Sequence, residues 1–415
     1  MTNRSILDNS LWIFLEKATK LIVYFGLGVL LARYLGARDF GLYSLVSSVL
    51  VIGMAVSSVG LNGVLVKEFV KYRFSRVFYS AVIVRFIGSA IVSLATFLLL
   101  YSWILKTIDW RLSALVSLAI TFSLVRVVDL FFESQLKSSI IAKYRVLGYI
   151  SGALLKVTFL FSGFGYQALI VAHIAELFFI FVIGFYYLNK FESIILTVRK
   201  NSLLYSRSLL RKGMPLFYSS IIVIIYMKVD VFFINYYLDY SAVGVYSAAS
   251  RLLEGLFLFP AIVLPSIFPK MVQLRRNNFT QYCALVQRTT YFLMASGLAL
   301  SLIIYFSCEY LINFIYGPSY ADAVFVLRIY SLAIPMVYFG EVLSKLIIIE
   351  NILKLSIYRH SLGLAVNVLL NYLLIPYCGI KGAAIASVFG YIAATIIFTL
   401  LTKRMRIIVR EAVLL

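Results

Sequence analysis

The chain has 415 residues, of which 62% are hydrophobic and 13% are charged, and its mean hydropathy is +0.97. Soluble domains are about half apolar and about a quarter charged, so this composition excludes an ordinary water-soluble globule. The excess of 38 Lys and Arg over 17 Asp and Glu would suggest nucleic acid in a soluble chain, but here most basic residues lie in short segments between apolar runs, which excludes that partner.

Apolar runs long enough to cross a bilayer, about 20 residues each, recur along the whole sequence. They predict twelve spans in two sets of six. The first set covers 10–33, 40–66, 78–102, 112–135, 141–163 and 166–188, and the second covers 212–237, 243–268, 289–308, 323–348, 355–376 and 380–402. We therefore expect an all-α polytopic membrane protein with two six-helix lobes, residues 1–205 and 206–415, and no loop long enough to form a soluble domain.

The distribution of Lys and Arg predicts the orientation of these spans. If the N-terminus is cytoplasmic, 28 basic residues belong to the inside segments and the inner ends of spans, among them Arg85, Arg145 and Arg199. The outside segments hold six, which are Arg33, Arg38, Lys106, Arg111, Arg328 and Lys381. Because cytoplasmic segments of membrane proteins are enriched in Lys and Arg, both termini are predicted to be cytoplasmic.

The two halves contain an internal repeat. The stretch YLGARDFGLYS from Tyr34 recurs as YLDYSAVGVYS from Tyr237, and five residues of the first, Gly41 among them, coincide with identical residues 203 positions later. Both copies lie between the first and second spans of their half. Since six is even, the repeat is parallel, with an axis along the membrane normal. Chance similarity among apolar segments is the alternative.

Charged residues inside the spans are the candidate functional residues. The bases are Arg126, Lys156, Lys228 and Arg251, and the acids are Asp129, Glu133, Glu176, Asp230, Glu254 and Glu341. A charge at membrane depth costs several kcal/mol, so it faces a partner or a wet cavity. These residues predict either a hydrated cavity for an anionic substrate or a set of ion pairs between helices.

Spacing along the helices separates these readings in part. Arg126 and Asp129 are three residues apart and share a helix face, as do Arg251 and Glu254. Lys156 has no acid within four residues, so it needs a partner on another helix, a wet face or a depressed pKa.

Two further pairs leave alternatives open. Lys228 and Asp230 point to different faces because they are two residues apart. His173 and Glu176, three apart, form either a proton-linked pair or a satisfied polar contact.

Prolines and cysteines add two expectations. Pro260, Pro265 and Pro269 in the eighth span and Pro335 in the tenth predict bent or locally unwound helices. The three cysteines, Cys283, Cys308 and Cys378, are far apart and the two histidines are isolated, so neither a disulfide framework nor a metal site is expected.

Three segments resemble one known family. Residues 32–68, 213–271 and 370–398 resemble bacterial O-antigen and polysaccharide translocases, the Wzx-type flippases of the multidrug/oligosaccharidyl-lipid/polysaccharide (MOP) exporter superfamily. The resemblance implies a MATE-like fold and a transporter of the bacterial inner membrane, not an enzyme, that uses no cofactor. Its implied substrate is an undecaprenyl-pyrophosphate-linked oligosaccharide, flipped to the periplasmic leaflet by alternating access and coupled to an ion gradient or the membrane potential. A polysaccharide polymerase and a chain-length regulator are implied as partners besides the lipid bilayer.

The resemblance also suggests roles for particular residues. In related lipid II flippases an Arg-x-x-Glu pair on the eighth span lines the cavity, and Arg251 and Glu254 match it. Those relatives carry arginines on the first span, where this chain has Lys17 and Lys20. The predicted substrate-binding residues are Arg251, Lys228, Lys156, Arg126 and Lys20. The predicted ion-coupling or gating residues are Glu254, Asp230, Asp129 and Glu176.

Three other functions compete with this interpretation. A multidrug or cation antiporter of the same superfamily would line its cavity with more acids than bases. A membrane-bound polymerase or glycosyltransferase would need a sizeable periplasmic loop or an acidic metal motif, and the sequence has neither. A purely structural scaffold would have no need of buried charges and kinked helices.

Overall fold

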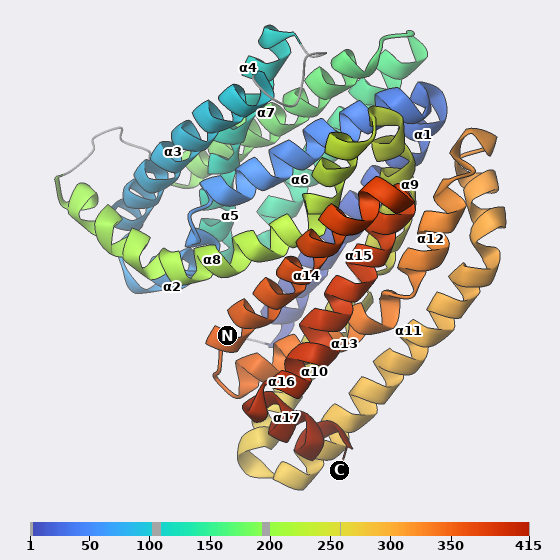
Figure 1. Ribbon diagram of the computed structural model, residues 1–415. Helices are drawn as coiled ribbons and strands as arrows, with labels where there is room; N and C mark the ends of the chain where they lie inside the picture. Colours follow the sequence, from blue (N-terminus) through green and yellow to red (C-terminus); the bar gives the residue numbers. More distant parts are fainter. Residues whose placement is uncertain (1–2, 102–108, 193–199, 258, 415) are drawn as a thin grey trace. The chain divides into compact units, whose positions relative to one another are not determined.

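The computed structural model describes residues 3–101, 109–192, 200–257 and 259–414, and within these ranges it is built from helices, without a strand (Figure 1). This confirms the predicted all-α class. Lys106 and Arg199, which contribute to the predicted orientation, lie outside the described residues.

The first half of the described chain is a succession of long helices and shorter helical segments. They are α1 (Asn3–Ser57), η1 (Leu61–Gly63), α2 (Leu65–Lys71), α3 (Phe74–Leu99), α4 (Trp110–Ala119), η3 (Ile120–Leu124), α5 (Val125–Ser134), α6 (Ser138–Phe161), α7 (Tyr166–Phe191) and α8 (Lys200–Tyr237).

The second half of the described chain is likewise a succession of long helices and shorter helical segments. Its helices are α9 (Tyr240–Leu256), α10 (Phe259–Asn277), α11 (Phe279–Ile315), η4 (Pro318–Tyr320), α12 (Ala323–Ser331), α13 (Ile334–Ile349), α14 (Lys354–Cys378), α15 (Ile380–Ile392), η5 (Ala393–Ile397), α16 (Phe398–Leu401), α17 (Lys403–Val409) and η6 (Arg410–Leu414).

Ten of the described helices are long and apolar enough to cross a membrane, and eleven if α12 and α13 form one span. One of the ten is the 47-residue stretch Leu11–Ser57 of α1. At 1.5 Å per residue it rises about 70 Å, roughly twice the hydrocarbon thickness of a bilayer. Gly36 interrupts it with a φ of 73° and a ψ of 173°, at the position where the sequence predicts the first span to end and the second to begin. The total of twelve spans stays a prediction.

The chain divides into two compact units. The first comprises the residues up to Leu35 and Leu42–Ile224, and the second comprises Gly36–Gly41 and Ile225–Leu415. The division falls within α8, and the predicted lobe boundary between residues 205 and 206 lies near the beginning of the same helix. In the first unit α6 packs along α7 and α2 along α5, over a core that includes Leu65, Phe132 and Leu209. In the second, α14 packs along α15 and α11 along α13.

The repeated segments meet within the second unit at their shared glycines. A Cβ on Gly41 would lie 1.8 Å from the Tyr240 carbonyl oxygen, and a Cβ on Gly244 would lie 1.9 Å from the Ala37 carbonyl oxygen. Gly41 and Gly244 are 203 positions apart, as are Ala37 and Tyr240, so the two approaches are the same contact made twice. This reciprocity favours a true repeat over chance similarity, because only glycine permits so close an approach of two backbones.

The helix breaks lie next to some of the prolines. The axes of α12 and α13 differ by 43°, and Pro335 lies in the first turn of α13, where its missing N–H breaks no helical hydrogen bond. Helix α9 ends at Leu256, three residues before α10 begins at Phe259. Helix α10 continues through Pro265 and Pro269, so the expectation of bending holds at only some of these residues.

Candidate functional site

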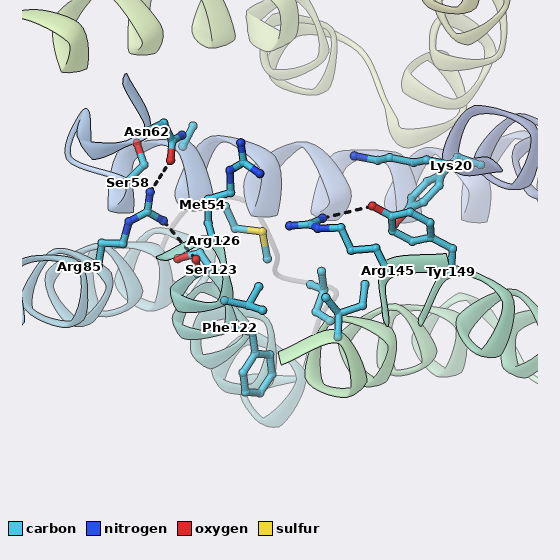
Figure 2. A pocket seen from close by; sticks show the side chains of 15 residues that line it. Lys20, Met54, Ser58, Asn62, Arg85, Phe122, Ser123, Arg126, Arg145 and Tyr149 are labelled. Atoms are coloured by element: carbon cyan, nitrogen blue, oxygen red, sulfur yellow. Dashed lines mark hydrogen bonds between the residues drawn. The ribbon is translucent and has the colours of Figure 1, made fainter. Parts of the chain in front are cut away.

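A cationic pocket of about 270 Å³ lies inside the first unit (Figure 2). Four basic side chains line it, each from a different helix: Lys20 from α1, Arg85 from α3, Arg126 from α5 and Arg145 from α6. The remaining wall is polar or apolar and is formed by Tyr24, Met54, Ala55, Ser58, Asn62, Phe122, Ser123, Val125, Tyr149, Leu177 and Ile180. No Asp or Glu belongs to this lining.

Arg85 is the most deeply buried of the four cations, with 1% of its surface exposed. Its guanidinium donates to the Ser123 carbonyl oxygen at 3.2 Å and to the Asn62 side-chain oxygen, as Figure 2 shows. Its Nε has no hydrogen-bond partner, and among the described residues no carboxylate lies within 4.0 Å of the group. Burying a charge without a counter-ion is costly, so this cation is expected to receive an anion from outside the chain.

Asp129 anchors two of the other cations. Its carboxylate is fully buried and accepts hydrogen bonds from Arg126 at 3.2 Å, from Arg145 and from the Tyr144 hydroxyl. The spacing of α5 places Arg126, Asp129 and Glu133 on one face, and Glu133 also pairs with Arg126 at 2.9 Å. The predicted local pairing of Arg126 is confirmed, and Asp129 acts as the group that fixes two guanidinium groups at the pocket.

The pocket therefore has more positive than negative charge. Asp129 pairs with Arg126 and Arg145, and Glu133 pairs with Arg126, but neither acid lines the pocket. Glu16 accepts a hydrogen bond from Tyr149 at 2.7 Å. Neither Lys20 nor Arg85 forms an ion pair with a described acid. An arginine offers a planar fork of donors that can bind two phosphate oxygens at once, so the arrangement fits a phosphate-bearing anion.

Lys156 lies in a separate cluster beside the pocket. Its Nζ is 2.5 Å from Oε2 of Glu176 and 3.3 Å from Nδ1 of His173, both on α7. Of the three alternatives that the sequence leaves open for Lys156, the structure shows a partner on another helix. Lys156 itself does not belong to the pocket lining, so its role in substrate binding stays a prediction.

Asp230 in the second unit is a buried carboxylate surrounded by neutral donors. It accepts hydrogen bonds from Tyr246 at 2.6 Å, Asn367 at 3.0 Å, Asn371 at 2.7 Å and Ser387 at 2.5 Å. Among the described residues no Lys or Arg forms an ion pair with it. The side-chain oxygen of Asn371 has no hydrogen-bond partner. The cluster thus holds a buried carboxyl group without a cationic partner among the described residues.

The remaining predicted residues also lie in the second unit. Lys228 pairs with Glu254 at 2.8 Å, which joins α8 to α9. Arg251 lies over the ring of Phe40, with its guanidinium carbon 4.8 Å from the ring centroid. Lys228 remains partly exposed and Asp230 is buried, which agrees with the expectation that they point to different faces.

Two of the four cations of the pocket are not among the candidates that the sequence predicts. Arg85 and Arg145 count there as basic residues that orient the spans, yet the structure places both inside helices and in the pocket lining. A signal for them is present, because both lie within the predicted spans 78–102 and 141–163. Asn62 and Ser123, which hold Arg85, give no such signal.

Similar solved structures show the fold of the chain. The lipid II flippase MurJ, in an inward closed conformation, has a TM-score of 0.74 at 14% identity, over 95% of this chain and 87% of that one. An inward-facing multidrug resistance MATE transporter of the MOP superfamily has a TM-score of 0.61 at 17% identity, over 95% and 94%. A MOP superfamily transporter from Pyrococcus furiosus has 0.63 at 16% identity, over 98% and 96%. At these identities the likeness shows the fold, which is that of MOP-superfamily transporters and flippases.

The family follows from the sequence itself. The chain belongs to the polysaccharide biosynthesis protein family, which it matches over residues 30–325, well over half of its length. A comparison with curated proteins finds no match. Family and fold together confirm the predicted resemblance to Wzx-type flippases, and the apolar helices of the described residues agree with the predicted multi-pass membrane protein.

Proposed function

We propose that the protein flips an undecaprenyl-pyrophosphate-linked oligosaccharide, such as an O-antigen repeat unit, from the cytoplasmic to the periplasmic leaflet of the bacterial inner membrane. It does so by alternating access through a cationic cavity, with both termini in the cytoplasm. The cation-rich pocket binds the diphosphate that joins the lipid to the glycan.

The observation that carries this proposal is the buried guanidinium of Arg85, which has no carboxylate partner among the described residues and one unpartnered donor. A diphosphate supplies the missing negative charge and enough oxygens for several guanidinium groups at once. Lys20, Arg126 and Arg145 line the same pocket, so four cations are available to one anion.

The relatives support the same class of substrate. One similar structure is a lipid II flippase, and the family takes its name from polysaccharide biosynthesis. We infer a lipid-linked glycan as a substrate that agrees with both descriptions. Arg251, Lys228 and Lys156 are proposed to contribute further positive charge along the route, with Glu254 as the partner that gates Lys228.

Asp230 is proposed to bind the coupling ion, which would be a proton or a monovalent cation. A buried carboxylate with four neutral donors and no ion pair among the described residues can take up a positive charge without displacing a cation of the protein. Asp129 and Glu176 hold cations of the first unit in place and are proposed to respond to the arrival of the substrate.

A multidrug or cation antiporter is the second candidate, favoured by the buried acid Asp230 and by the MATE-like fold. It would bind an organic cation. The lining of the pocket in the first unit argues against it, because four cations and no acid would repel such a substrate.

The test is glycolipid translocation in bacterial cells that lack their own flippase and make the cognate glycan. Wild type should restore periplasmic delivery, and Arg85→Ala and Arg251→Ala should each reduce it at least tenfold at equal membrane abundance. Arg207→Ala, an exposed basic residue of α8, is the control and should deliver normally. Failure of the wild type to restore delivery at full expression would contradict the flippase assignment.

A further inference from the structure

Three titratable side chains lie together beside the cationic pocket, and none of them belongs to its lining. We call Lys156, His173 and Glu176 the triad. Glu176 is 1% and Lys156 2% exposed at the side chain, and His173 is 14% exposed. The distances are 2.5 Å between Lys156 and Glu176, 3.3 Å between Lys156 and His173, and 3.5 Å between His173 and Glu176. Three groups that exchange protons are thus in mutual contact in a buried place.

We propose that the triad is a proton-binding site that takes up a proton when an anion enters the pocket. The inference deepens the proposed function and rests on it, because the anion is the diphosphate of the substrate. It names the proton as the ligand of a site distinct from Asp230.

Tyr24 is the physical link between the triad and the pocket. Its hydroxyl donates to Oε1 of Glu176 at 2.5 Å, and its side chain lines the pocket. The ammonium nitrogen of Lys20 lies 5.7 Å from the centre of the Tyr24 ring, and that of Lys156 lies 5.5 Å from it. The same ring is therefore close to a cation of the pocket and to a cation of the triad.

The pocket cation that lies beside Tyr24 is Lys20, and the charged groups that act on Lys20 are Arg145, Glu16, Glu176 and Arg126. When Arg85 and the acids that pair with the two arginines, Asp129 and Glu133, are included, the groups outside the triad are four cations and three acids. An extra proton on the triad is accordingly disfavoured while the pocket is empty, since it adds positive charge to a region that already has an excess.

The proton has a defined place to bind. In the structure Lys156 can donate to Glu176 and to Nδ1 of a neutral His173, and the triad is then neutral overall. An added proton from water binds to the Nδ1 lone pair once Lys156 turns its N–H away from it. The new Nδ1–H then faces Oε2 of Glu176, already 3.5 Å away, so the carboxylate lies between two cations and no other bond is formed or broken.

An anion in the pocket reverses the balance of charge. Two or more negative charges beside Lys20 and Tyr24 stabilise the protonated triad by attraction, so the anion raises the affinity for the proton. By linkage the proton raises the affinity for the anion by the same factor.

The triad also lies near one end of its helices. Lys156 is five residues before the end of α6 and His173 is seven residues after the start of α7, distances along the axis of about 8 and 10 Å. In the proposed orientation this end faces the periplasm, so the proton would come from that side.

The test follows the titration of His173 directly. The chain has two histidines, so the His360→Asn variant with ¹³C-labelled histidine gives a single NMR signal, once the variant is shown to bind pyrophosphate as the wild type does. Inorganic pyrophosphate, the probe, should raise the titration midpoint of His173 by roughly one pH unit. Calorimetry in buffers of different ionisation enthalpy should show proton uptake on binding.

Variants separate a linked site from a structural one. Glu176→Gln keeps the size of the side chain and should abolish proton uptake, while Tyr24→Phe, which removes only the bond to Glu176, should at least halve it. Normal pyrophosphate binding with an unmoved His173 titration and no proton uptake would overturn the proposed linkage alone. If the wild type does not bind pyrophosphate, the proposed function fails and the linkage fails with it.

Discussion

The pocket of the first unit and the Asp230 cluster of the second have opposite electrostatics. The pocket gathers four cations, and its innermost member, Arg85, has no carboxylate partner among the described residues. The cluster holds one carboxylate on four neutral donors. Ion pairs elsewhere in the described chain, such as Arg275 with Glu350 at 2.6 Å, show that the sequence can supply counter-ions where it needs them. Arg359 is a third buried charge without an ion pair among the described residues, so the absence of a counter-ion alone does not define a site. The pocket and the Asp230 cluster are the two places where we propose that ligands of opposite charge bind.

Asp129 gives the largest expected effect. Substituting Asp129→Ala leaves Arg126 and Arg145 without their shared buried acceptor, and removing one partner of a buried ion pair costs about 3–5 kcal/mol. We expect a large drop in the thermal unfolding midpoint in detergent. The control is Glu133→Ala, which removes a half-exposed partner and should cost less than about 1 kcal/mol. Equal effects of both variants would contradict the anchoring role of Asp129.

Arg85→Met separates binding from stability. Replacing a buried charge that has no counter-ion among the described residues with an apolar side chain should leave the unfolding midpoint unchanged or raise it. Binding of pyrophosphate should weaken at least about tenfold, or about 1.4 kcal/mol. Arg359→Met is the matched control, because Arg359 is also a buried guanidinium with an unpartnered Nε but lies in the second unit. Equal losses of binding in both variants would remove Arg85 from the site.

Asp230→Asn tests the proposed ion site of the second unit. At a concentration 100 times its dissociation constant, an ion bound at Asp230 stabilises the wild type by about 2.7 kcal/mol. The amide that replaces the carboxylate has no charge to bind the ion, so the response of the unfolding midpoint to sodium or to pH should disappear in this variant. Asp239→Asn, a change at the exposed N-cap of α9, should keep the response. A wild type that responds to neither ion would argue against the coupling role.

The smallest expected effect on stability is at Glu68, which lies outside the predicted spans and forms an ion pair with Lys212. Burial raises the pKa of Glu68, but hydrogen bonds from Lys212, at 2.8 Å, and from Tyr205 outweigh it and hold the pKa below its usual value of 4.5. A lowered pKa gives stability that is present above pH 4.5 and is lost as the pH falls through the pKa of the folded state. The loss should stay below about 1 kcal/mol, because Lys212 is exposed.

Thermal midpoints of wild type and Glu68→Gln, measured from pH 6 to pH 3.5, check this sign. The wild-type midpoint should fall more steeply than that of the variant. Parallel curves would show that the pair contributes nothing.

Much of the fold could be predicted from the sequence. Long apolar runs define helices because no other element satisfies its own backbone within a membrane, and Gly36 breaks α1 where charge and glycine mark the boundary of two spans. The contacts between Lys156 and Glu176 and between Lys228 and Glu254 could not be predicted. They join different helices, and spacing along one helix reveals only neighbours on that helix.

Only half of the cations in the candidate site could be predicted. Arg126 stands out as a charge within a span, and Lys20 is implied by the family resemblance, whereas Arg85 and Arg145 count only toward the topology. A count of Lys and Arg on each side of the membrane assigns a basic residue near the end of a span to the adjoining segment. The side chain of that residue can nevertheless point into the protein. The burial that distinguishes the two cases depends on packing, which sequence alone does not show.

The most direct test of the account is equilibrium binding of inorganic pyrophosphate to the purified protein, with the organic cation ethidium as the competing class of ligand. We predict that wild type binds pyrophosphate with an affinity that falls as salt rises, that Arg85→Met loses most of this affinity, and that ethidium does not compete. Binding of ethidium without binding of pyrophosphate would contradict the central claim, that the first unit holds a site for a phosphate-bearing anion.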